Sequence, residues 1–329
     1  MNKKSSPLVL VSHALPDGWL QLLEERCELI IGPPEGNQLV EKLTAKLPFA
    51  EGLFTLLTIK VDEDLLDKAP NLKVVSNMAV GYDNIDIDAC TRRSLPVGNT
   101  PGVLTEGTAD LTIAIMLAAA RRLIEAHQDA REGRWKTWSP TGWLGKDLSG
   151  AKLGIVGMGK IGTAVAKRAK GFGMEILFSD PNSNQDLIDQ LDAKPMELDE
   201  LLEEADFVTL HVPLTTETRH MIDIKALQLM KPNALLINTS RGPVIDQLAL
   251  TQALKEGKIG GAALDVTDPE PLPADNELYS LKNCLIVPHI GSATWNTRRK
   301  MAERACQNLL AGLEGIKLPY CVNPEIYEA

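Results

Sequence analysis

The chain has 329 residues, of which 44% are hydrophobic and 24% charged, so it is long enough for two domains with well-buried cores. Its net charge of −10 argues against nucleic acid or an acidic membrane surface as a partner, because such partners require a concentrated basic face. No apolar run approaches the roughly 20 residues of a membrane span, and the scattered cysteines, which lack C-x-x-C spacing, indicate a reducing cytoplasm and no metal site.

The first 99 residues alternate short apolar runs with amphipathic segments. The apolar runs, which we expect to be strands, lie at 8–11, 28–31, 52–57, 72–76 and 95–99. The amphipathic segments, which we expect to be helices, lie near 18–25, 38–46, 62–68 and 87–93. Such alternation predicts a parallel sheet covered by helices on both faces, and hence one complete α/β unit.

Residues 101–145 break this pattern. An Ala-rich helix is predicted up to residue 122, apolar on most of its circumference, and such a helix must be buried between layers or against another chain. The loop after it carries Trp135, Trp138 and Trp143, and tryptophan is enriched at interfaces. We therefore expect this segment to contain a dimer surface, with packing inside one chain as the alternative for the loop.

Residues 152–180 have the pattern of a strand, a glycine turn, a helix and a second strand. The turn has the spacing G-x-G-x-x-G, in which Gly157 permits the tight turn, Gly159 lets the backbone approach a diphosphate, and Gly162 lets helix and strand pack closely. The N–H groups and the dipole of the first helical turn attract the anion. We expect the turn to bind a dinucleotide through Gly157, Met158, Gly159, Lys160, Ile161 and Gly162.

Asp180 ends the second strand of this segment and bears on the choice of dinucleotide. A carboxylate here can accept hydrogen bonds from the ribose hydroxyls of NAD, but it repels the 2′-phosphate of NADP. No basic residue follows at 181–184. NAD(H) is therefore favoured, although a cation from another loop would still permit NADP(H).

The alternation resumes after the glycine turn. Strands are predicted at 207–213, 234–240, 261–266 and 284–289, and helices at 197–204, 223–230, 247–256 and 294–312. We expect an α/β protein with two doubly wound parallel-sheet domains. They are a flavodoxin-like substrate domain, discontinuous over 1–100 and 295–329, and a Rossmann NAD domain over 101–294. Ligands would bind in the cleft between the domains, beyond the carboxyl ends of the strands.

Three ionisable residues follow strands of the second domain: Arg241, Glu270 and His289. When a hydride reaches a carbonyl carbon, negative charge develops on the oxygen, which must be protonated. A histidine can supply that proton, a neighbouring carboxylate would hold the imidazolium, and an arginine would bind a substrate carboxylate. Together with the dinucleotide motif, the trio fits the reduction of a carbonyl group in a substrate that carries a carboxylate. Without that motif, a histidine after a proline at a strand end would more often be structural.

Several segments resemble the signature motifs of the D-isomer-specific 2-hydroxyacid dehydrogenases, and they occur in that family's order. They are A-V-G-Y-D-N-I-D from residue 79, G-M-G-K-I-G from 157, N-T-S-R-G-P-V-I-D from 238, A-A-L-D-V-T-D-P-E-P-L-P from 262 and P-H-I-G-S-A-T from 288. The C-terminal segments look closest to the glyoxylate and hydroxypyruvate reductase branch. The resemblance covers nearly the whole chain.

This resemblance implies roles for individual residues. Arg241 would anchor the substrate carboxylate, His289 would be the acid/base, and Glu270 would be its partner. The substrate pocket would also contain Leu57, Val80, Gly81 and, inserted from a partner subunit, Trp143. The cofactor would contact Thr108, Val212, Pro213, Thr239, Ser240, Arg241, Asp265, His289 and Gly291, with Asp265 fixing the nicotinamide carboxamide. His211 lies near the cofactor side but is interpreted as structural.

The implied activity is NAD(P)H-dependent reduction of glyoxylate or hydroxypyruvate to the D-2-hydroxy acid by a cytoplasmic homodimer. Related phosphite dehydrogenases carry a lysine where this chain has Val80, and the apolar residue suits a small monocarboxylate better. The alternatives are a 2-ketogluconate, D-lactate or phosphite enzyme, or a dinucleotide-sensing regulator that resembles the C-terminal-binding corepressors.

Overall fold

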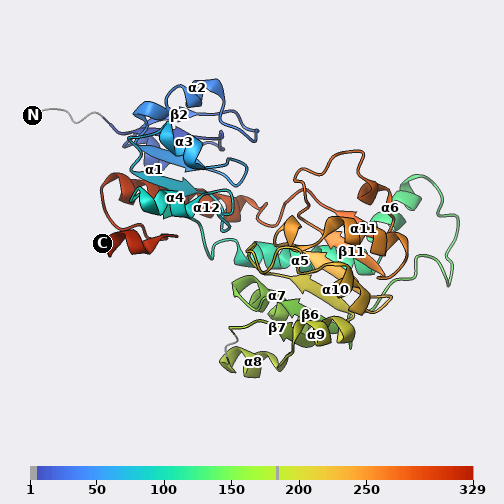
Figure 1. Ribbon diagram of the computed structural model, residues 1–329. Helices are drawn as coiled ribbons and strands as arrows, with labels where there is room; N and C mark the ends of the chain where they lie inside the picture. Colours follow the sequence, from blue (N-terminus) through green and yellow to red (C-terminus); the bar gives the residue numbers. More distant parts are fainter. Residues whose placement is uncertain (1–5, 183–184, 329) are drawn as a thin grey trace, which may run out of the picture. The chain divides into compact units, whose positions relative to one another are not determined.

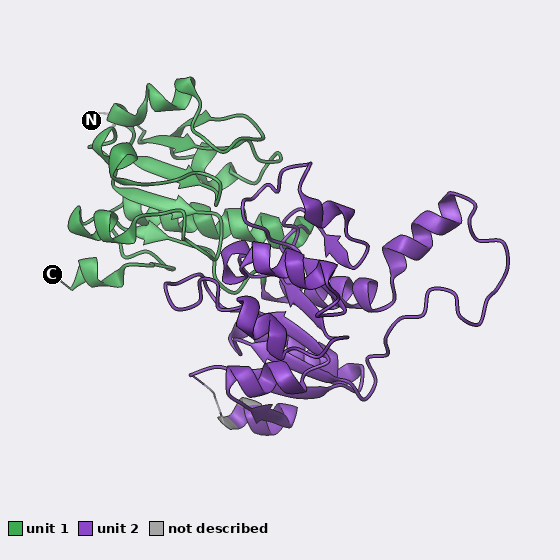
Figure 2. Cartoon of the chain, turned by 45° about the vertical axis from the view of Figure 1, so that its right-hand side comes forward, with its two compact units in different colours: residues 1–104, 294–329 green, residues 105–293 purple. Residues whose placement is uncertain are grey.

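Figure 1 shows the helices and strands of the chain in a computed structural model, which describes residues 6–182 and 185–328. The chain forms two compact units (Figure 2). Unit 1 contains Met1–Leu104 and Thr294–Ala329, and unit 2 contains Thr105–Ala293. The first unit is therefore built from both ends of the chain.

Unit 1 is centred on five parallel strands in the order β2-β1-β3-β4-β5. The strands are β1 (Leu8–Val11), β2 (Glu28–Ile31), β3 (Gly52–Thr55), β4 (Val74–Asn77) and β5 (Val97–Gly98). The helices are α1 (Gln21–Glu24), α2 (Glu41–Thr44), α3 (Glu63–Asp67), α4 (Ile87–Arg92) and α12 (Trp295–Leu313). This strand order is that of the flavodoxin-like doubly wound fold, as predicted.

Helix α12 returns from the end of the chain and packs on β3 and β4. Close approach depends on Gly312, where a Cβ atom would lie 2.5 Å from Cβ of Val74. On unit 1's short helices, Asp62 and Asp86 are N-caps that accept hydrogen bonds from Leu65 N and Ala89 N. The predicted helices of this unit are confirmed, although most are shorter than their amphipathic segments.

Unit 2 is centred on seven parallel strands in the order β12-β11-β10-β9-β6-β7-β8. They are β6 (Lys152–Val156), β7 (Glu175–Ser179), β8 (Ala193–Pro195), β9 (Phe207–Leu210), β10 (Leu235–Asn238), β11 (Gly261–Leu264) and β12 (Cys284–Ile286). The order reverses between β6 and β9, which is the switch point of a Rossmann fold. The predicted fold class is confirmed.

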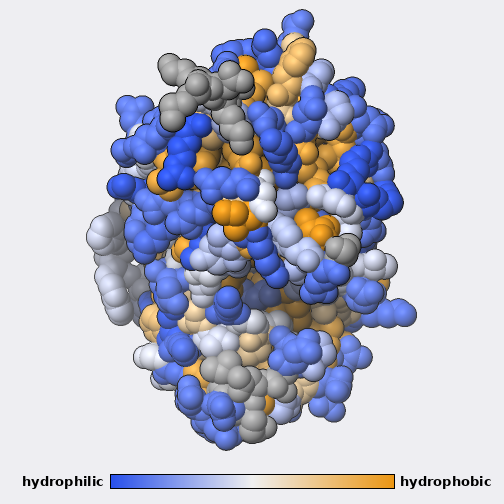
Figure 3. Space-filling model, turned by 90° about the vertical axis from the view of Figure 1, so that its left-hand side faces the viewer, coloured by the Kyte–Doolittle hydropathy of each residue, from blue (hydrophilic) through white to orange (hydrophobic). Residues whose placement is uncertain are grey.

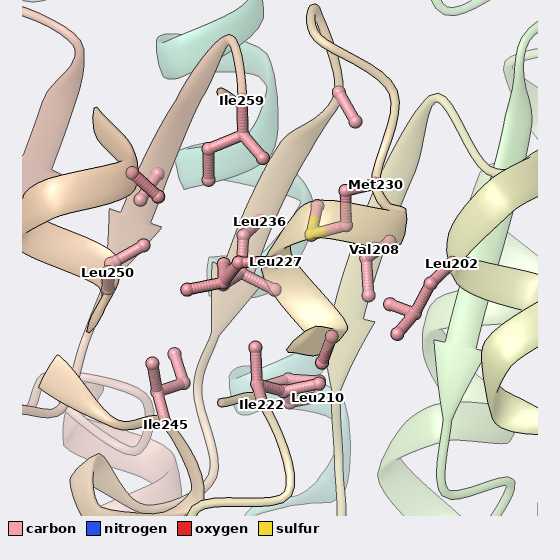
Figure 4. Packing of buried hydrophobic residues seen from close by; sticks show 14 of the residues in the cluster. Leu202, Val208, Leu210, Ile222, Leu227, Met230, Leu236, Ile245, Leu250 and Ile259 are labelled. Atoms are coloured by element: carbon pink, nitrogen blue, oxygen red, sulfur yellow. The ribbon is translucent and has the colours of Figure 1, made fainter. Parts of the chain in front are cut away.

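Each face of this sheet has its own apolar core. Helices α5 (Thr105–Ala120) and α7 (Lys160–Gly171) cover one face. Helices α9 (Leu198–Glu204), α10 (Ile224–Leu229) and α11 (Gln247–Lys255) cover the other, where Leu202, Val208 and Leu236 belong to one buried cluster (Figure 4). Burial on both faces explains why these strands are almost continuously apolar in the sequence.

Two α-helices and one strand of unit 2 were not predicted: α6 (Leu123–Arg131), α8 (Gln185–Leu191) and β8. The helix predicted to reach residue 122 ends at Ala120, because Arg122 is in the left-handed region at φ 52° and the chain then starts α6. Helix α6 buries none of its residues, and its Leu123 and Ile124 are exposed. Strand β8 has three residues, including Lys194 and Pro195, as is usual for a sheet edge.

The face of the molecule drawn in Figure 3 is mostly hydrophilic, with apolar residues in small separate groups. Scattered exposed apolar residues of this kind are normal on a protein surface. Within residues 6–182 and 185–328, no helix has the length and apolar character needed to cross a membrane.

Candidate active site

The predicted site residues of unit 2, apart from Thr108 and Trp143, follow the strand ends along one edge of its sheet. The last residues of neighbouring strands are register partners, in the series Ser179, Val156, Leu210, Asn238, Leu264 and Ile286. Because all the strands run parallel, the residues directly after them lie along the same carboxyl edge. These residues include Gly157, Asp180, Thr239 and Asp265. The topology therefore brings together segments that are up to 130 residues apart in the sequence.

The three glycines of the turn between β6 and α7 differ in their surroundings, and two of them leave no room for a side chain. Gly157 has φ +93°, and a Cβ atom there would lie 2.8 Å from the carbonyl oxygen of His211. A Cβ atom on Gly162 would lie 2.1 Å from the carbonyl oxygen of Gly157. A Cβ atom on Gly159 would meet nothing within 4 Å. Because this N-cap residue is a glycine, no side chain of its own caps the first turn of the helix. The open approach to the first turn of α7 fits a dinucleotide diphosphate.

Asp180, directly after β7, accepts a hydrogen bond from the glycine turn. Its Oδ2 accepts a hydrogen bond from Met158 N at 2.7 Å, and its Oδ1 accepts one from Asn182 N at 2.7 Å. The carboxylate is thus fixed beside the turn, with lone pairs left for ribose hydroxyls. Residues 183–184, where a basic side chain was sought in the sequence, lie outside the described residues.

Asp265 holds the loop that carries His289. Its backbone oxygen accepts from His289 N at 2.9 Å, its Oδ1 from Ile290 N at 2.6 Å, and its Oδ2 from Gly291 N at 2.8 Å. Burial raises the pKa of the Asp265 carboxyl, and the two hydrogen bonds from the backbone oppose this shift. One residue therefore binds three consecutive N–H groups. The role predicted for Asp265, binding of the nicotinamide carboxamide, remains a prediction.

His289 and Glu270 form a pair at the end of the site. His289 Nδ1 and Glu270 Oε1 are 2.5 Å apart, and both side chains are partly exposed. The backbone of His289 is in the left-handed region at φ 50°, which is uncommon for a non-glycine residue and is imposed here by the bonds to Asp265. Because Nδ1 faces the carboxylate, Nε2 is the ring nitrogen that can exchange a proton with a substrate.

Arg241 lies on the loop after β10, and Asn238 shapes this loop. Asn238 Nδ2 donates to Arg241 O at 2.8 Å, and Asn238 Oδ1 accepts from both N and Oγ of Ser240. Arg241 Nη1 donates to the carbonyl oxygen of Ser240 at 2.8 Å. We did not predict a role for Asn238. The available signal was a fully buried polar residue that ends an apolar strand, at the start of the motif N-T-S-R-G.

Thr108 and Thr239 are brought together by Thr112 on α5. Thr112 Oγ1 donates to Thr108 O at 2.8 Å and lies 2.9 Å from Thr239 Oγ1. Thr108 also lies next to Gly291, since a Cβ atom added to Gly291 would lie 3.4 Å from Thr108 Oγ1. The first turns of α5 therefore belong to the same edge as the loops after β10 and β12.

His211, Val212 and Pro213 follow β9 at the switch point. Burial lowers the pKa of His211 to about 3, and its Nε2 lies 3.0 Å from Thr209 Oγ1. The ring is therefore neutral near pH 7, in keeping with a structural role. Val212 is partly buried and packs against the apolar core under α9, α10 and α11. Its predicted contact with the adenine of the cofactor remains a prediction.

The remaining predicted residues lie elsewhere in the chain. Leu57, Val80 and Gly81 belong to unit 1, in the loops after β3 and β4. Trp143 belongs to unit 2, where its Nε1 donates to Asp129 Oδ2 of α6 at 2.8 Å. Asp129 is also bound by Arg134, and these two hydrogen bonds lower the pKa of its carboxyl. The proposed insertion of Trp143 into a partner's pocket therefore remains a prediction.

Comparison with known proteins gives consistent results. Residues 113–291 match the family model for the NAD-binding domain of the D-isomer-specific 2-hydroxyacid dehydrogenases. The chain is 48% identical to a glyoxylate reductase of Korarchaeum cryptofilum, over 97% of each chain. It is 47% identical to a glyoxylate reductase of Thermococcus litoralis, over 97% of this chain and 98% of the relative. A crystal structure of a protein from Thermus thermophilus superimposes with a TM-score of 0.89 at 45% identity, covering 96% of this chain and 99% of that one.

We expect Asp265→Asn to lower the free energy of unfolding by about 1–3 kcal/mol, because the amide nitrogen would face a backbone N–H in place of an oxygen acceptor. Asp246→Asn is the matched control. Asp246 caps α11 through one oxygen, Oδ1, which accepts from Leu248 N and Ala249 N, and an asparagine oxygen can do the same. Urea unfolding of both variants measures the difference. Equal losses of stability would show that the Asp265 carboxylate does not hold the loop.

Proposed function

The chain belongs to the D-isomer-specific 2-hydroxyacid dehydrogenase family, and from this premise we propose that it reduces glyoxylate, and hydroxypyruvate as a second substrate. Membership makes it an oxidoreductase that uses a nicotinamide dinucleotide. The proposal of substrate is supported by the names of its relatives, glyoxylate reductases that match nearly its full length. The observation that carries the reaction type is the 2.5 Å pair of His289 and Glu270 on the same sheet edge as the glycine turn.

In this proposal the chain's own residues bind the substrate and supply a proton. When bound, the reduced nicotinamide supplies the hydride for the carbonyl carbon. Glu270 accepts the Nδ1 proton of His289 in a hydrogen bond and stabilises the imidazolium before the reaction. His289 then donates its Nε2 proton to the carbonyl oxygen as charge develops there.

Recognition of the substrate carboxylate is assigned to Arg241, with the N–H groups of Val80 and Gly81 as further donors. The guanidinium is charged at all physiological pH values and offers a planar pair of donors. Val80 adds no charge, so the loop would favour a monocarboxylate over a multiply charged oxyanion. This combination favours glyoxylate and hydroxypyruvate over phosphite.

We expect His289→Asn to lower kcat for glyoxylate about 10²–10⁴-fold, because the variant has no group that can donate the proton. Asparagine tolerates the left-handed backbone of this position, so the loop should keep its conformation. His220→Asn is the matched control, since His220 also has a positive φ, of 54°, and is exposed. Steady-state kinetics with purified protein measures both the substrate and the effect, with NADH or NADPH for glyoxylate, hydroxypyruvate and pyruvate, which are reduced, and with NAD⁺ or NADP⁺ for phosphite, which is oxidised. Unchanged turnover by His289→Asn would remove the acid/base assignment, and a wild type active only on phosphite would remove the proposed substrate.

We further propose that NADH is preferred over NADPH, because the Asp180 carboxylate lies beside the turn and would repel a 2′-phosphate. Asp180→Ala should lower the ratio of kcat/KM for NADH to that for NADPH about tenfold. A ratio is measured because it cancels any general loss of active protein. Glu175→Ala removes a negative charge from the exposed first residue of the same strand, β7, and should leave the ratio unchanged. An unaltered ratio in Asp180→Ala would place the selectivity in another residue.

We also propose that two copies of the chain associate through α6 and the loop after it. This arm projects from the rest of unit 2 (Figure 2), and its exposed apolar residues are Leu123, Ile124, Trp135, Trp138 and Leu144. Beside it, α5, α6 and the amino ends of β11 and β12 line a groove of about 590 Å³. Such exposed apolar surface is typical of a protein interface.

Sedimentation equilibrium should therefore give the mass of two 35.8 kDa chains for the wild type and a shift toward one chain for Trp138→Asp. Trp138 is 80% exposed in the unit. Trp295→Asp is the control, because Trp295 is 77% exposed and lies on α12, outside the arm. A monomeric wild type, or equal dissociation of both variants, would contradict this interface.

A further inference from the structure

The loop after β4 has three consecutive carbonyl groups that are bound from within unit 1. Ala79 O accepts a hydrogen bond from Thr100 N at 2.8 Å. Val80 O accepts one from Asn99 Nδ2 at 2.8 Å, and Gly81 O accepts one from Asn77 Nδ2 at 2.9 Å. Two of these three donors are asparagine side chains, which makes the loop conformation dependent on residue identity.

The bound carbonyls determine where the intervening N–H groups point. In a trans peptide the C=O and the following N–H point to opposite sides of the chain. When the oxygens of Ala79 and Val80 face their donors, the N–H groups of Val80 and Gly81 face away from them. None of the hydrogen bonds found among the described residues uses either of these N–H groups as donor. Successive N–H groups that face one way form an anion-binding concavity.

We propose that Asn77 and Asn99 are positioning residues that hold the Val80 and Gly81 N–H groups in place for the substrate carboxylate. The inference rests on the proposed function, in which this loop binds the carboxylate of a 2-oxo acid. The two asparagines act through the loop and do not touch the reacting atoms.

The positioning contacts extend into the body of unit 1. Asn308 of α12, fully buried, donates from Nδ2 to Asn99 O at 2.9 Å and accepts from Tyr320 N at Oδ1. The backbone of Asn99 is therefore held by Asn308, while its side chain donates to Val80 O. The C-terminal helix thus contributes to the shape of the loop after β4.

Asn77 links the same loop to the loop that contains Leu57. Its Nδ2 also lies 3.2 Å from Asn84 Oδ1, and Asn84 Nδ2 donates to Leu56 O at 3.2 Å and Ile59 O at 2.8 Å. The loop after β4 and the loop that contains Leu57, both assigned to substrate binding, are therefore linked by the amide side chains of Asn77 and Asn84.

Two buried polar atoms beside the loop after β4 have no hydrogen-bond partner in the part of the chain that the structure describes. Among the described residues, the buried side-chain oxygens without a hydrogen-bond partner are Asn77 Oδ1 and Thr100 Oγ1, which flank the loop. A buried oxygen without a partner is destabilising, and such groups need a reason to persist. Asn77 nevertheless binds Gly81 O through its Nδ2, and Thr100 binds Ala79 O through its backbone N–H, so both residues with an unpaired oxygen also hold the loop.

The test compares a substrate that has a carboxylate with one that lacks it. Asn99→Ala and the similarly sized Asn99→Asp both remove the donor to Val80 O, and Asn99 is only partly buried, so both variants should fold. We expect KM for glyoxylate to rise about tenfold with little change in kcat. The kcat/KM for glycolaldehyde, which has the aldehyde but no carboxylate, should change less than twofold. The Kd for NADH should also be unchanged.

Asn71→Ala is the matched control, because Asn71 Nδ2 donates to Pro48 O at 2.7 Å in unit 1, outside the loop. It should leave both substrates unaffected. Equal losses for glyoxylate and glycolaldehyde in the Asn99 variants would overturn the positioning role while leaving the proposed function intact. A wild type that reduces glycolaldehyde but not glyoxylate would overturn the proposed function and this inference together.

Discussion

The candidate active site depends on one buried carboxylate, that of Asp265. Its residue accepts the N–H groups of three consecutive residues, and these bonds impose the left-handed backbone of His289. A non-glycine residue with this backbone conformation would otherwise be strained. With the backbone fixed, the imidazole meets Glu270 at 2.5 Å and keeps its other nitrogen available for proton transfer. The backbone of the residue proposed as the acid/base is thus fixed by hydrogen bonds that do not involve its ring, and the ring itself is held by Glu270.

The parallel sheet supplies the rest of the arrangement. Its strands end in register, so the glycine turn, Asp180, Asp265 and the loops after β10 and β12 lie along one edge. Polar side chains then fix these loops, as the buried amide of Asn238 does for the loop that carries Arg241. The same principle applies in unit 1, where Asn77 and Asn99 bind the carbonyl groups of a loop. Both units use buried or partly buried polar side chains to hold loops.

Most strands and the strand-end positions could be predicted, because buried parallel strands are continuous apolar runs and the glycine turn has a fixed spacing. Helix α6 could not, since the helix before it was extended to residue 122, and no local pattern marks the left-handed Arg122 that separates the two helices. The contact of Asp265 with Ile290 and Gly291 was also beyond sequence reasoning. It accompanies the left-handed φ of His289, and no local pattern marks a non-glycine residue for that conformation.

The central claim is that the glycine turn and the His289–Glu270 pair serve one reduction. A crystal structure of the wild-type protein with NADH and oxamate, a 2-oxo acid analogue that is not reduced, tests it most directly. We expect the diphosphate at the first turn of α7, and His289 Nε2 within hydrogen-bonding distance of the oxamate oxygen that replaces the reacting carbonyl. A diphosphate bound away from Gly159, or an imidazole without contact to oxamate, would contradict the account.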